Sequence, residues 1–172
     1  MELNYKNLLP PAFRDDSKLW IYQSDRAFNN EEAAVIIDML NSFVAGWKSH
    51  GAPVKGYANL FYSQFIVILA DESSTMVGGC STDSSVHLIK AIEEKFKVDL
   101  FNRQNLAFII NDQTQLIPLN ELEKAVEDRV IDQDTLYFNN TVLTKKELET
   151  GWIIPVKQSW LAKRIPVKAD QS

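Results

Sequence analysis

The chain has 172 residues, of which 45% are apolar and 24% charged, and these proportions are typical of one globular domain. Its net charge of −5 argues against general nucleic-acid binding, which depends on Lys and Arg side chains that neutralise phosphates. No apolar run is long enough to cross a membrane, and one cysteine cannot form an internal disulfide, so we expect a cytoplasmic protein with no membrane segment.

The N-terminal residues predict an arm followed by a strand. Paired prolines at positions 10 and 11 exclude a helix interior and favour an extended arm over residues 1–17. Residues 18–23 are rich in aromatic and β-branched side chains, which are typical of a short strand.

A long amphipathic helix is predicted next. Asn29 and, three residues later, Glu32 have the spacing of a capping box, and the apolar residues after them recur at helical spacing. Gly51 and the proline at position 53 are typical of residues just beyond a helix, so we expect this helix to end near His50.

Three further elements follow. Residues 54–61 and 64–70 predict the two strands of a hairpin, and the second is almost wholly apolar, as expected at the centre of a sheet. A second amphipathic helix is predicted to start between positions 81 and 83. Residues 106–110 predict another strand.

This order of elements predicts the α+β fold class, with a ferredoxin-like βαββαβ core over residues 18–111. In that fold the sheet is antiparallel, both helices cover one face, and the first and third strands are central. Residues 112–172 show weaker signals for short strands and helices, with capping patterns at Asn120 and Thr144. We therefore expect a single domain, 1–172, in which residues 112–172 form a mixed α/β extension packed on the core.

The turn between the apolar strand and the second helix is rich in small and hydroxyl residues. Such a run before a helix N-terminus is where anions bind and where nucleophiles are often placed. We therefore consider this turn a site for a small anionic ligand. The candidate ligand-binding residues are Asp71, Gly78, Gly79, Ser81, Thr82 and Ser84.

The predicted topology adds a candidate catalytic group. Because the third strand would run antiparallel to the first, the turn after the first helix and the turn after the third strand would lie at the same edge of the sheet. That edge would bring together His50 and Cys80, with Asp83 as the acid that orients them. The helix dipole favours a thiolate at a helix N-terminus, and an imidazole beside it could act as its base in hydrolysis or acyl transfer.

Each of these residues also has a simpler structural interpretation. A lone cysteine is usually a small buried apolar residue, Ser81 and Asp83 are good helix caps, and His50 suits the negative end of a helix dipole. The sequence contains no metal-ligand spacing such as C-x-x-C or H-E-x-x-H, so we expect no metal site and no cofactor.

The segments Trp20–Arg26, Trp47–Gly51 and, most specifically, Gly79–Val86 resemble a set of short uncharacterised bacterial proteins often labelled "ABC transporter ATPase". The resemblance covers most of the chain but implies no established activity, and it assigns no functional residues. The ATPase label has no support in the sequence, because a phosphate-binding P-loop needs G-x-x-x-x-G-K-[ST]. The nearest match, Gly51–Gly56, continues with Tyr57 instead of lysine.

The sequence leaves two functions open. The first is a small binding or assembly module without catalysis, and the second is a thiol-dependent hydrolase or acyltransferase at the Cys80 turn. A ferredoxin-like sheet leaves one face without helices, which either residues 112–172 or a second copy in a homodimer would cover. The apolar residues expected to make these surface contacts are Tyr57, Phe61, Trp152 and Trp160.

Overall fold

The computed structural model of the chain describes residues 1–166, which belong to two compact units. The three-stranded unit contains Asn4–Asn102 and Leu143–Glu149. The four-stranded unit contains Met1–Leu3, Arg103–Val142 and, within the described part of the chain, residues 150–166. Both units combine helices with antiparallel strands, so the α+β class expected from the sequence is confirmed.

The three-stranded unit has a sheet in the order β1-β5-β4, in which both neighbouring pairs are antiparallel. Its strands are β1 (Lys18–Gln23), β4 (Lys55–Phe61) and β5 (Phe65–Asp71). All seven residues of the central strand β5 are buried, which explains its almost wholly apolar sequence. The expected antiparallel pairing of the first and third strands is confirmed, with Leu19 opposite Leu69.

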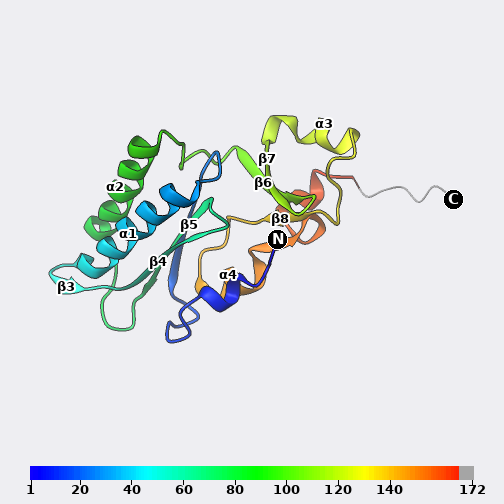
Figure 1. The fold of residues 1–172 in the computed structure, drawn as a ribbon. Coiled ribbons are helices and arrows are strands. Elements are labelled where there is room, and N and C mark those ends of the chain that lie inside the picture. The colour runs from blue at the N-terminus through cyan, green and yellow to red at the C-terminus, as the bar shows by residue number, and fades with distance from the viewer. Residues whose placement is uncertain (167–172) are drawn as a thin grey trace. The chain divides into compact units, whose positions relative to one another are not determined.

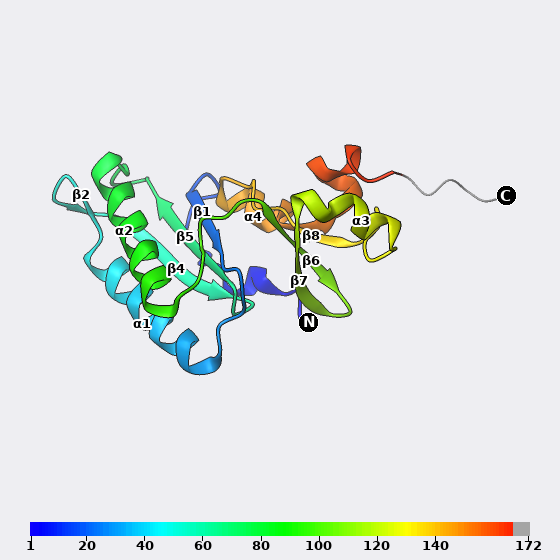
Figure 2. The same cartoon turned by 90° about the horizontal axis from the view of Figure 1, so that it is seen from above.

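Two helices, α1 (Asn30–Gly46) and α2 (Gly79–Phe96), lie side by side over one face of this sheet (Figures 1 and 2). They enclose a core of buried apolar side chains, to which β5 contributes every second residue from Ile66 to Ala70. This alternation follows from the strand period of two, which sends successive side chains to opposite faces.

Arg26 joins the start of α1 to the end of α2. Its guanidinium forms two hydrogen bonds with the Glu32 carboxylate, at 2.8 and 2.9 Å, and donates to the Phe96 carbonyl oxygen at 2.8 Å. The hydrogen bond from Arg26 lowers the pKa of Glu32. Glu32 also completes the predicted capping box with Asn29, which is confirmed.

The end of α1 differs from the prediction. The helix stops at Gly46, and a short hairpin of β2 (Lys48–Ser49) and β3 (Ala52–Pro53) follows. Its turn residues, His50-Gly51, have φ angles of 50° and 80°, as a type I′ hairpin turn requires. The histidine is therefore a hairpin residue and not a helix end. The helix stops early because Trp47 adopts an extended conformation and buries its indole in the core.

The second face of the three-stranded sheet is not left open. The N-terminal arm forms a short 3-10 helix, η1 (Tyr5–Leu8), and lies with α4 (Lys145–Gly151) on the side of the sheet away from α1 and α2 (Figure 1). The Tyr5 hydroxyl donates to the Leu148 carbonyl oxygen at 2.7 Å, and the Tyr57 hydroxyl donates to that of Leu8 at 2.7 Å. Segments from both ends of the chain therefore contribute to this face.

Two of the four apolar residues expected on the surface are buried instead. Phe61 is 1% exposed and Trp152 is 0% exposed. Tyr57 is half-buried, and only Trp160 of the four is an exposed side chain, at 42%. A large aromatic residue in a strand or beside one is favoured in the core because it buries a large apolar area.

The four-stranded unit has a sheet in the order β7-β6-β8-β9, with all three pairs antiparallel. Its strands are β6 (Asn105–Ile110), β7 (Gln113–Pro118), β8 (Leu136–Phe138) and β9 (Ile153–Pro155), and its α-helix is α3 (Leu122–Glu127). Its 3-10 turns are η2 (Leu119–Glu121), η3 (Val156–Gln158) and η4 (Trp160–Lys163). Together they surround a separate apolar core.

The strand expected to complete a ferredoxin-like sheet is therefore in a different sheet. β6 pairs with β7 and β8, so the strand order does not confirm the βαββαβ topology. A physical reason is the two-residue turn Asn111-Asp112, whose φ angles of 50° and 64° suit a tight hairpin. It gives β6 an immediate partner in sequence, and pairing across so short a loop costs little chain entropy.

The C-terminal capping predictions have mixed outcomes. The Thr144 hydroxyl accepts from the Glu147 N–H at 3.2 Å, and α4 ends at Gly151, as predicted. Asn120 does not cap α3, because the chain enters that helix through η2 and no side chain accepts a hydrogen bond there.

Candidate functional site

Asp71, a candidate ligand-binding residue, is the buried last residue of β5. One carboxylate oxygen accepts from the Arg14 N–H at 3.1 Å and from the Lys55 ammonium at 3.0 Å, and the other accepts from the Ser73 N–H at 2.9 Å. Lys55 also donates to the Ala12 carbonyl oxygen at 2.9 Å. Asp71 and Lys55 therefore hold the N-terminal arm against the sheet.

These contacts determine the charge state of Asp71. Burial alone would raise the pKa of its carboxyl group, because it disfavours the ionised form. The hydrogen bonds from Ser73, Arg14 and Lys55 outweigh burial and hold the pKa of Asp71 well below its usual range. A carboxylate whose two oxygens both accept hydrogen bonds in this way holds together the chain segments that donate to it.

α2 begins earlier than predicted, with Gly78 as its N-cap and Gly79 as its first residue. No side chain caps this helix end, and Ser81 and Asp83 lie inside the helix, so the prediction that they are caps is wrong. Cys80 lies in the first turn with an exposed side chain, which excludes its interpretation as a buried apolar residue.

The hydroxyl groups around Cys80 are bound to the helix itself. Those of Ser81 and Thr82 donate to the Gly78 carbonyl oxygen at 2.9 and 3.0 Å, and that of Ser84 donates to the Cys80 carbonyl oxygen at 3.0 Å. Such bonds to a carbonyl three or four residues earlier are common for Ser and Thr in helices. They direct the three hydroxyl hydrogens to the backbone, whereas an anion would need them as donors.

The hairpin turn after α1 meets the start of α2. The Ser49 hydroxyl accepts from the Gly78 N–H at 3.3 Å, and the His50 Nε2 atom lies 3.2 Å from the position that a Cβ atom on Gly78 would occupy. The buried Trp47 indole N–H donates to the Ser81 carbonyl oxygen at 3.0 Å. The two turns therefore lie at the same edge of the sheet, as the antiparallel strand order requires.

No hydrogen bond joins the candidate catalytic side chains. Among residues 1–166, the thiol of Cys80, the imidazole of His50 and the carboxylate of Asp83 form no hydrogen bond or ion pair, and all three side chains are exposed. A nucleophile and its base act through a hydrogen bond of about 2.6–3.2 Å. The structure brings His50 to the turn that precedes Cys80 without forming a catalytic dyad.

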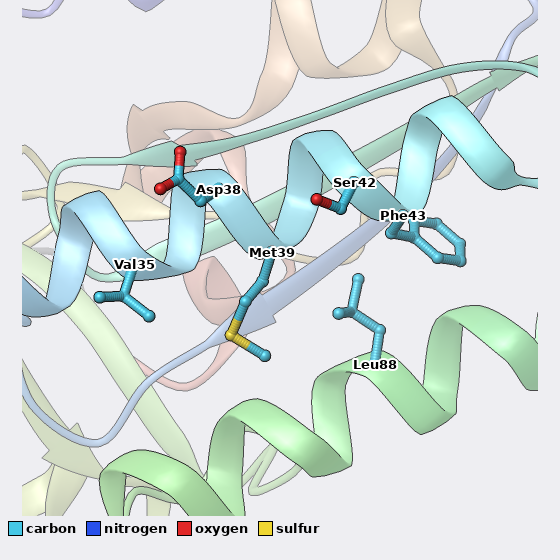
Figure 3. A pocket seen from close by; sticks show the side chains of 6 residues that line it. All are labelled: Val35, Asp38, Met39, Ser42, Phe43 and Leu88. Atoms are coloured by element: carbon cyan, nitrogen blue, oxygen red, sulfur yellow. The ribbon is translucent and has the colours of Figure 1, made fainter.

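A second candidate site lies between α1 and α2, in front of the sheet as seen in Figure 3. It is an open groove with a volume of about 540 Å³. Five lining residues come from α1 and one from α2: Val35, Asp38, Met39, Ser42, Phe43 and Leu88. Val35, at 39% exposed, and the half-buried Met39 extend from α1 to the side where α2 lies, and Leu88 extends from α2 toward α1 (Figure 3).

The groove was not identified from the sequence. The helical spacing of the apolar residues places Phe43 and Leu88 on the apolar stripes that the sequence predicts to be buried, but the fully buried residues of α1 are Ile36 and Leu40. The missed signal is a second stripe on α1 in which Val35, Met39 and Phe43 follow at intervals of four residues. A helix that is apolar on two sides has one side available for a further contact.

Comparisons with protein-family models, with curated proteins and with solved structures found no match to this chain. Within the described part of the chain, no helix is both long and apolar enough to cross a bilayer. In the same residues, no three His, Cys, Asp or Glu side chains are grouped so that they could hold a metal ion.

Proposed function

We propose that the chain is a small binding module without catalysis and that the groove between α1 and α2 is its binding surface. The observation that supports this proposal is the groove itself, whose lining is apolar except for Asp38 and Ser42. Exposed apolar side chains grouped in a groove are typical of protein-binding sites. Because the core beneath holds both helices, an occupant would not have to order them on binding.

A thiol-dependent enzyme is the second candidate function. Its support is the exposed Cys80 in the first turn of α2 and the approach of the His50 ring to Gly78. The missing hydrogen bond between thiol and imidazole and the binding of the neighbouring hydroxyls to the backbone make it the weaker candidate.

A neutral apolar dye tests the proposed groove directly. We expect Nile red fluorescence to rise on titration with the protein and to lose most of that rise in the Met39→Gln variant, which places an amide in the groove. The matched control is Met76→Gln, because Met76 is 74% exposed and does not line the groove. Circular dichroism should be the same for both variants. Equal dye binding by both variants, or no binding by the wild type, would refute the proposal.

The three-stranded unit also supports a proposal about fold relationship. We propose that it is a ferredoxin-like arrangement lacking its fourth strand. Apart from the short β2-β3 hairpin inserted after α1, the order β1-α1-β4-β5-α2 and the sheet order β1-β5-β4 agree with the first five elements of that fold. We also propose that the protein is cytoplasmic, which its single cysteine supports. We propose further that it belongs to the bacterial family that the Gly79–Val86 segment resembles.

A further inference from the structure

From the lining of the groove we infer that its occupant is a basic amphipathic helix of another protein, seated between α1 and α2 with its apolar face inward and a Lys or Arg beside Asp38. This inference rests on the proposed function and names the class of partner. The groove, its one carboxylate and the charge of α1 each contribute to the argument.

The shape of the groove fits a helix. Val35, Met39 and Phe43 form one row along α1 at intervals of four residues, and Leu88 faces them from α2. Rows at this spacing are the ridges that pack into the groove of a neighbouring helix. An occupant with apolar residues at the same spacing would fill the open space between the two helices as a third helix.

The charge of the groove selects a basic partner. Asp38 is the one charged side chain among the six lining residues, and within residues 1–166 its carboxylate takes part in no hydrogen bond or ion pair. α1 carries Glu31, Glu32 and Asp38 and no Lys or Arg, and Arg26 pairs with Glu32 alone of these. Figure 3 shows the Asp38 carboxylate on the side of α1 away from α2, so it forms the outer edge of the groove. A long Lys or Arg side chain of the occupant would reach across α1 to this unpaired carboxylate.

The same charge argues against a second copy of this chain in the groove. A two-fold contact uses the same patch on both subunits. It would place two Asp38 carboxylates in one interface to which the lining residues contribute no cation. Like charges brought together without a partner oppose association, so a partner of opposite charge fits the groove better.

Two synthetic peptides of about 18 residues test the inference. They share a leucine face and carry either lysines or glutamates on the polar face, and each has a terminal fluorophore for anisotropy measurements. We expect the lysine peptide to bind at least about tenfold more tightly than the glutamate peptide and to bind more weakly as salt is added. Asp38→Asn should weaken the lysine peptide about two- to five-fold, which is the range of one exposed charge pair.

The control variant is Glu94→Gln, which removes one exposed charge from α2 and does not line the groove. It should leave the affinity for the lysine peptide unchanged. If Asp38→Asn and Glu94→Gln have equal effects, or if both peptides bind equally, the inference is overturned while Nile red binding can still support the groove. If Met39→Gln abolishes a concentration-dependent dimer in ultracentrifugation, the occupant is a second copy and the inference is also overturned. If neither dye nor peptide binds, both proposals fail.

Discussion

Asp71 offers a sharp test of whether a candidate site residue is structural. The Asp71→Asn substitution removes a carboxylate that is 0% exposed and that accepts three hydrogen bonds, from Arg14, Lys55 and Ser73. Hydrogen bonds to a charged group contribute about 1.5–3 kcal/mol each. The asparagine retains one oxygen, and Lys55, whose side chain is 40% exposed, regains water. We therefore expect a loss of about 3 kcal/mol in the free energy of unfolding.

Urea unfolding at pH 7, followed by circular dichroism, measures this loss. The control is Asp16→Asn, because the Asp16 side chain is 69% exposed and its pair with Arg14 is at the surface. It should change the free energy by less than about 0.5 kcal/mol. A loss below about 1 kcal/mol for Asp71→Asn would refute the role of Asp71 as a buried tether.

The pKa of Asp71 adds a dependence on pH. Since the folded state holds that pKa well below its usual range, the ionised group stabilises the fold at every pH above the ordinary aspartate pKa of about 4. This contribution is lost as the pH falls below that value toward the folded-state pKa. The Asp71→Asn variant should therefore lose less stability than the wild type between about pH 4 and pH 2. Parallel pH profiles for the two proteins would contradict this reasoning.

Two further predictions concern the edge where the His50 turn meets α2. Gly56→Ala should cost about 1–3 kcal/mol in urea unfolding, because its Cβ atom would lie 2.7 Å from Cε3 of the buried Trp47 ring. The control is Gly79→Ala, whose Cβ atom would have nothing within 4 Å, and it should be neutral or stabilising by up to about 1 kcal/mol. Equal losses of stability in the two variants would show that the contact with Trp47 does not cause the loss in Gly56→Ala. His50→Asn keeps a residue that tolerates positive φ and should leave the rate at which iodoacetamide labels Cys80 unchanged. A fall of about tenfold or more would instead identify His50 as the base of the thiol and favour the enzyme.

The sequence correctly predicted those features of the fold that depend on a few neighbouring residues. The apolar run of β5 and the capping box at Asn29 were correct, because burial on both faces and a missing N–H partner are both visible in a few residues. The end of α1 was missed because burial of Trp47 outweighed the continuing helical pattern. Helix propensity is a weak guide where tertiary packing competes with it.

The pairing of strands that are distant in sequence was harder to predict than the strands and helices themselves. A ferredoxin-like sheet in which the first and third strands are central requires β6 to lie beside β1. Whether a strand joins one sheet or another depends on competing partners, and here the Asn111-Asp112 hairpin gives β6 a partner that is nearer in sequence. For the site, topology correctly brought the His50 turn to the start of α2. The groove was missed because the sequence pattern does not separate residues that face the core from those that face a neighbouring helix, as with Met39 and Leu88.

The most direct test of the binding surface is a map of backbone amide shifts in ¹⁵N-labelled protein titrated with the lysine peptide. We predict shifts concentrated on residues 35–43 of α1 and around Leu88 of α2, where the groove is lined. Shifts confined to residues 78–84 and His50, or spread without relation to α1 and α2, would contradict a binding surface between these two helices.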